Sequence, residues 1–83
     1  MTREIRYKSS VNRDLKQIEP ADKARILGEI REVLGANPRG GEPLHGEFEG
    51  LYKLRVGDYR VVYALAGDDV LVLRIRRRSA AYG

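Results

Sequence analysis

The chain has 83 residues, no cysteine, and 16 lysines and arginines against 12 acidic residues. This length favours a single domain, and the absence of cysteine excludes disulfide bonds and thiolate metal sites. The start, MTREIRYKSS, lacks the apolar run of a secretory signal, and no stretch approaches the ~18 apolar residues of a membrane helix, so we expect a soluble cytoplasmic protein without membrane contact.

The first half of the chain predicts one strand and two helices. Residues 3–9 suit a short strand, and Ser9, Ser10 and Asn12 are candidate caps of a following helix. The apolar side chains of this helix recur at helical spacing, at Val11, Leu15 and Ile18.

Pro20 suits the first turn of a second helix. Its apolar stripe includes Ile26, Ile30 and Leu34, and Gly35 is expected to stop it. The two short amphipathic helices predict a helical hairpin.

The second half predicts a loop and three strands. Residues 35–50 contain five glycines and two prolines, which is typical of a loop. Residues 51–56, 59–65 and 70–76 alternate or run apolar as strands do. The fold class is therefore α+β, of type βααβββ, with a helical hairpin packed on one face of a small twisted antiparallel sheet.

The excess positive charge lies entirely in the C-terminal part of the chain. Residues 1–49 carry nine basic and nine acidic residues, whereas residues 50–83 carry seven basic residues and three aspartates. Six of these seven are arginines, which suit forked contacts with phosphate. This asymmetry indicates a surface for a polyanion or an acidic partner, against the alternative of a solvated basic face.

A two-residue turn at Gly57-Asp58 sets the register of the first two of these strands. It places Arg55 opposite Arg60, on the same face as Lys53. Like charges in that position are destabilising, so the pair suggests a site for a bound anion. The alternative is neutralisation by nearby carboxylates such as Glu42, Glu47 and Glu49.

For the last strand, we prefer the register that buries three large apolar side chains, those of Leu71, Leu73 and Ile75. The basic face then gains four residues: Val70, Val72, Arg74 and Arg76. Arg77, Arg78 and Tyr82 follow beyond the expected strand end. Together these residues predict an open groove lined by arginines.

The usual catalytic sets are missing. His45 is the sole histidine, which argues against a catalytic triad or a histidine-pair ribonuclease, and no metal site is predicted. RNA, however, carries an internal nucleophile in its 2′-OH, and arginines could stabilise the charge that develops on the attacked phosphate. Tyr82 is a candidate proton acceptor, because nearby arginines lower a tyrosine pKa; alternatively it packs on the sheet edge.

The stretches PLHGEFEGLYKLRVGDYRVVY and VLVLRIRRRSAAY resemble the RelE/ParE superfamily of toxins from toxin–antitoxin systems, and the RelE-type messenger-RNA interferases most of all. The resemblance runs over nearly the whole chain in element order. It implies one RelE-like domain over residues 1–83, cleavage of mRNA in the ribosomal A site by 2′-OH attack, and no cofactor or metal. It also implies a RelB-like antitoxin as partner.

The resemblance implies roles for individual residues. Arg60, Arg78 and Tyr82 match catalytic positions, and Lys53 and Arg55 match RNA contacts. We add Arg74, Arg76 and Arg77 to the RNA-binding set from their charge.

The chain departs from its relatives at several positions, which leaves activity level and codon preference open. Relatives often have histidine at position 77 and lysine at position 45, and some have lysine at position 55. Two alternatives therefore stay open: a ParE-like poison of DNA gyrase without nuclease activity, and an inactive module that binds RNA or the ribosome.

Overall fold

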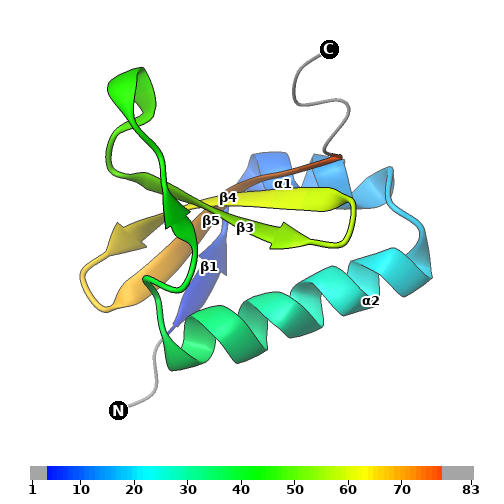
Figure 1. Cartoon of the computed structure of the whole chain (residues 1–83). Helices are drawn as coiled ribbons and strands as arrows, with labels where there is room; N and C mark the ends of the chain where they lie inside the picture. The colour runs from blue at the N-terminus through cyan, green and yellow to red at the C-terminus, as the bar shows by residue number, and fades with distance from the viewer. Residues whose placement is uncertain (1–3, 78–83) are drawn as a thin grey trace.

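The computed structural model describes residues 4–77 and confirms the α+β class (Figure 1). The elements, in chain order, are β1 (Ile5–Tyr7), α1 (Ser9–Lys16), α2 (Pro20–Glu29), the π-helical segment η1 (Ile30–Leu34), β2 (Glu42–Pro43), the 3-10 turn η2 (Gly46–Phe48), β3 (Leu51–Val56), β4 (Tyr59–Ala66) and β5 (Asp69–Arg77). None of the helices in this part of the chain is long and apolar enough to cross a membrane.

The sheet is mixed rather than antiparallel throughout. Its strand order is β1-β5-β4-β3-β2, and β1 pairs with β5 in parallel while the other neighbours are antiparallel. The expectation of an antiparallel sheet was wrong for β1, because a parallel pair needs a long crossover and the two helices supply it. The short strand β2 lies within the segment that was expected to be a loop.

The cap at the start of α1 and the end of the second helix differ from those expected. The N-cap of α1 is Lys8, without a side-chain capping bond, and Ser10 instead donates from Oγ to the carbonyl oxygen of Leu73 at 2.7 Å. Gly35 has a right-handed helical φ of −66°, so it does not end the second helix as predicted. Burial of Leu34 at 0% exposure holds this turn against the core, and tertiary packing outweighs the preference of glycine for a helix end.

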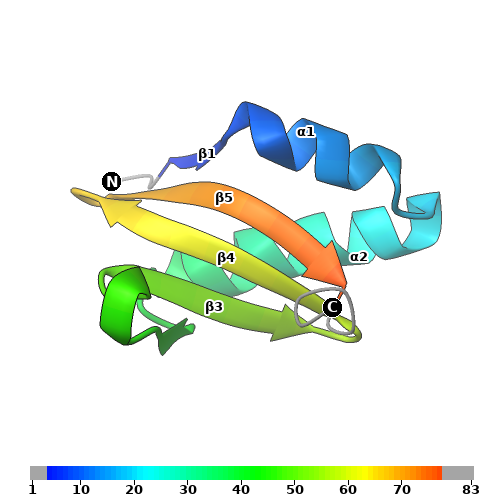
Figure 2. The same cartoon turned by 90° about the horizontal axis from the view of Figure 1, so that it is seen from above.

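The core lies between the helices and one face of the sheet. The helices contribute Val11, Ile26, Ile30 and Leu34, and the strands contribute Val61, Tyr63, Val70, Val72 and Ile75, all at 2% exposure or less. Figure 1 shows α2 crossing below the sheet. Figure 2 looks down on the other face, where neither α1 nor α2 covers β3, β4 and β5, and the short turn η2 lies at the start of β3. We call this other side the helix-free face.

The predicted register of the last strand was wrong in its first half. Val70 and Val72 are buried, whereas Leu71 and Leu73 are partly exposed. The pairing jumps between Val62 and Tyr63, which inserts one extra residue into β5. Only after this bulge does the strand follow the predicted pattern, with its isoleucine inside and its arginines outside.

Candidate functional site

Three arginines form a row across the helix-free face. Arg55 of β3 pairs with Arg60 of β4, which in turn pairs with Arg76 of β5. Adjacent strands lie only about 4.8 Å apart, so the three side chains start as direct neighbours. The predicted opposition of Arg55 and Arg60 is confirmed. This arginine row concentrates positive charge where no helix covers the described sheet.

A second row beside it is partly neutralised by the protein's own acids. Lys53 and Arg74 both pair with Val62 from opposite sides. Lys53 Nζ lies 3.3 Å from a Glu42 carboxylate oxygen, and Arg74 Nε lies 3.0 Å from Asp14 Oδ2. The Glu42 and Lys53 side chains differ in exposure, 71% against 28%, and such a surface pair contributes little stability. A polyanion could therefore displace Glu42 at little cost.

A shallow depression of about 210 Å³ lies at the β3 end of the arginine row. Its lining residues are Gly40, Gly41, Glu42, Lys53, Leu54, Arg55 and Arg60. The glycine pair lets the backbone come close, since a Cβ on Gly41 would lie 2.6 Å from the Lys53 carbonyl oxygen. The depression thus brings together three cations, those of Lys53, Arg55 and Arg60, with the single carboxylate of Glu42, so its lining carries a net positive charge.

Tyr63 fastens the wall of this depression. Its hydroxyl accepts a hydrogen bond from the Gly41 amide at 2.8 Å, and its ring stacks on Tyr52 with centroids 5.4 Å apart. Burial raises the pKa of Tyr63, although the Gly41 amide opposes the shift, so the hydroxyl stays neutral. The neutral, buried Tyr63 therefore has a structural role here and does not act as an acid or base.

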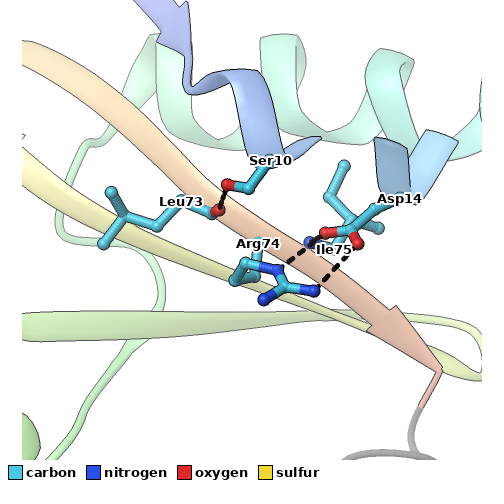
Figure 3. Close-up of polar contacts among 5 residues, drawn as sticks. All are labelled: Ser10, Asp14, Leu73, Arg74 and Ile75. Atoms are coloured by element: carbon cyan, nitrogen blue, oxygen red, sulfur yellow. Dashed lines mark hydrogen bonds and ion pairs between the residues drawn. The ribbon is translucent and has the colours of Figure 1, made fainter. Parts of the chain in front are cut away.

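Asp14 holds the other end of the site. Its carboxylate receives a forked pair of hydrogen bonds from Arg74, at 3.0 and 3.1 Å, and a third from the Ile75 amide at 3.0 Å (Figure 3). Partial burial by itself would raise the pKa of Asp14, but the bonds from Arg74 and Ile75 outweigh it and lower the pKa below its ordinary value. The hydrogen bonding with Asp14 also raises the pKa of Arg74.

Comparison with known proteins decides the family. The sequence matches the family described as ParE toxin of the type II toxin–antitoxin system parDE over residues 5–82. Toxin RelE of Mycobacterium tuberculosis is 43% identical over 75 residues, which cover 84% of this chain and 75% of the relative. Toxin RelG of the same organism is 32% identical, covering 94% of this chain and 93% of the relative. The chain belongs to the RelE/ParE superfamily of type II toxins.

The fold agrees with this assignment. A chain of the M. tuberculosis toxin–antitoxin complex RelBE2 superposes with a TM-score of 0.86 at 28% identity, covering 94% of this toxin and all of that chain. A double mutant of toxin RelE of E. coli in the free state has a TM-score of 0.79 at 17% identity, covering 99% of this toxin and 90% of that chain. The second likeness speaks for the fold alone.

One expected site residue, Arg77, stands apart from the arginine row. Arg77 is the last residue of β5 and pairs with Tyr59. In the alternation of side chains along β5 it falls on the same face as the core residue Ile75, although it is exposed. It borders a hollow of about 400 Å³ that Asp14, Arg74 and Arg76 also line. Arg78 and Tyr82 lie outside the described residues, and their roles in the toxin stay predictions.

The sequence reasoning missed Asp14, Tyr63 and the glycine pair. The dipeptide Gly40-Gly41 suggests that the backbone packs closely against another group. That group is Tyr63, which lies 22 residues after Gly41 in the chain. Tyr63 lies in an apolar strand pattern typical of a core residue, and this pattern does not show that its hydroxyl reaches Gly41. Asp14 sits on a helix among other charged residues, and nothing in its surroundings along the chain points to β5.

Proposed function

We propose that this toxin is a RelE-type endoribonuclease that cleaves mRNA in the ribosomal A site and so inhibits translation. The observation that carries the proposal is the row of Arg55, Arg60 and Arg76 across the helix-free face. Three adjacent guanidinium groups on one open face can bind successive backbone phosphates of an RNA strand. Membership of the superfamily adds the toxin role.

In the proposed reaction the substrate supplies the nucleophile. The 2′-oxygen bonds to the adjacent phosphorus, its proton passes to Tyr82, and the bond to the 5′-oxygen of the next nucleotide breaks. The products are a 2′,3′-cyclic phosphate and a 5′-hydroxyl end, which takes up a proton. Arg60 and Arg78 stabilise the extra negative charge on the phosphate in the transition state. Lys53, Arg55, Arg74, Arg76 and Arg77 hold the neighbouring phosphates.

We further propose that a RelB-like antitoxin restrains the toxin by covering the basic face. Support comes from similar solved structures, which include toxin–antitoxin complexes from M. tuberculosis and Pyrococcus horikoshii. An acidic partner surface would complement the arginine row, and release of that partner would uncover it.

The test is to induce the toxin in cells and to map RNA ends within translated reading frames. We expect cuts inside codons that Arg60→Ala and Tyr82→Phe both abolish. Arg13→Ala is the matched control, because Arg13 is an exposed arginine on α1, away from the arginine row. Cuts that persist in Arg60→Ala would refute the catalytic role of the row.

The match to the ParE toxin family favours a second candidate, a poison of DNA gyrase. This activity would induce the DNA-damage response without new RNA ends. Growth arrest with neither outcome would instead indicate a module that binds RNA or the ribosome without cleaving.

A further inference from the structure

The alternation of side chains along β5 between the core and the helix-free face shifts by one position at an inserted residue. In an uninterrupted strand, side chains two apart share a face, so Val72, Arg74 and Arg76 would all point to the core. The bulge at Leu73 breaks this pattern, and Ile75 takes the next core position at 2% exposure. Both arginines thereby turn to the helix-free face. The arginine row exists because of this bulge.

Two side chains of α1 hold the bulge in place. Strand β1 pairs with β5 only before the bulge, so another element must satisfy the outer edge after it. Ser10 Oγ donates to the Leu73 carbonyl oxygen at 2.7 Å, and Asp14 Oδ2 accepts from the Ile75 amide at 3.0 Å (Figure 3). The Asp14 carboxylate also accepts two hydrogen bonds from the guanidinium group of Arg74. The bonds thus fall on the extra residue itself and on the two residues that follow it.

We propose that Asp14 is a positioning residue of this toxin: its carboxylate locks the β5 bulge and so keeps Arg76 in line with Arg60. This inference rests on the proposed nuclease function. Without the lock, regular pairing would have to turn Arg74 and Arg76 into the core, which their charge forbids. The end of β5 is therefore expected to detach from β4, and Arg76 loses its fixed place beside the phosphate.

Electrostatics and positioning predict different effects of removing the Asp14 carboxylate on RNA binding and on the cleavage rate. Removal of the Asp14 carboxylate makes the basic face more positive, so charge alone would strengthen RNA binding. A lost position instead lowers the cleavage rate, even when binding is unchanged or tighter. The split between kcat and KM therefore separates the two effects.

The experiment compares Asp14→Ala, Asp14→Asn and Asp69→Ala in cleavage of mRNA on programmed ribosomes. Asp69 is the matched control, because it accepts a backbone hydrogen bond from the Glu4 amide at 3.0 Å at the opposite end of β5. We expect Asp14→Ala to lower kcat at least ~10-fold without raising KM. Asp14→Asn should recover most of the rate, because its amide oxygen still accepts from Ile75, and Asp69→Ala should match wild type. An unchanged or raised kcat in Asp14→Ala, or an equal loss in Asp69→Ala, overturns the inference.

A structural readout keeps this inference separable from the proposed function. By NMR, cross-strand contacts between Arg60 and Arg76 should weaken in Asp14→Ala, and the Ile75 amide should exchange with solvent at least ~10-fold faster. Ser10→Ala removes the hydrogen bond to the Leu73 carbonyl oxygen and should shift both readouts in the same direction, which covers the case in which Asp14→Ala does not fold. Retention of wild-type contacts and exchange in the variants refutes the lock. A lost lock in a toxin whose wild type cleaves no RNA supports the lock and refutes the nuclease.

Discussion

Arg55 and Arg60 lie directly opposite each other across the β3–β4 hairpin, with Arg76 next in line on β5. Nothing in the packing of the core demands this arrangement, because the row faces away from the helices. Opposed like charges on neighbouring strands lower stability, so we expect the row to cost the fold free energy at this place. Such local costs are typical of binding and catalytic sites.

Relief of this repulsion should be measurable. We predict that Arg55→Gln raises the free energy of unfolding by about 0.2–1 kcal/mol while it lowers RNA cleavage. Urea denaturation measures the first effect, and cleavage on programmed ribosomes measures the second. Arg13→Gln, on the exposed surface of α1, should change neither. A less stable Arg55→Gln protein would contradict the idea that the row is strained.

Binding of RNA should depend steeply on salt. Each phosphate contact on a single strand contributes a slope of about −0.7 to the logarithm of affinity against the logarithm of salt concentration. We therefore expect Arg55→Gln and Arg76→Gln each to make the slope shallower by about 0.7 relative to wild type. Fluorescence anisotropy with a short labelled RNA over a salt series provides the slopes. A slope that both variants share with wild type would remove these two arginines from the interface.

Two glycine-to-alanine changes should have opposite effects on stability. A Cβ at position 41 would lie 2.5 Å from the Tyr63 hydroxyl and 2.6 Å from the Lys53 carbonyl oxygen, so Gly41→Ala should destabilise the protein by about 1–3 kcal/mol. Gly28 in α2 has nothing within 4 Å of that position, so Gly28→Ala should stabilise it by about 0.5–1 kcal/mol through helix propensity. Thermal or urea unfolding of both variants checks the pair, and a neutral Gly41→Ala would show that the wall of the depression gives way.

Acid should weaken the Asp14 contact. Because the fold lowers the pKa of this carboxyl, the unfolded chain takes up its proton first as the pH falls. The contribution to stability is fully present above the unfolded pKa of about 3.9 and is lost as the pH falls through the lower folded value. Wild type should therefore lose more unfolding free energy than Asp14→Asn between about pH 5 and about pH 2. Urea unfolding across this range measures the difference, and equal losses would contradict it.

The hairpin shows what local sequence information is enough to predict. A two-residue turn at Gly57-Asp58 sets the register of both flanking strands, and Gly57 has the positive φ of 59° that such a turn needs. The opposition of Arg55 and Arg60 followed from this turn alone, with no knowledge of the helices.

The last strand shows where this reasoning ends. Its alternation was predicted from apolar side chains, yet Val72 and Ile75 are both buried although they stand three residues apart. Ser10 donates to the inserted residue Leu73 and Asp14 accepts from Ile75, and both partners lie more than 60 residues earlier in the chain. No pattern within residues 70–76 records these partners.

The amino-acid order by itself determined the two helices, the strands β1, β3, β4 and β5, the hairpin register and the excess of arginine in the second half, because turns, periodicity and charge act over neighbouring residues. Tertiary structure decided that β1 runs parallel to β5, that Tyr63 holds Gly41, and that Arg76 joins Arg55 and Arg60. These features depend on contacts between distant segments, whose partners are settled only when the whole core packs at once.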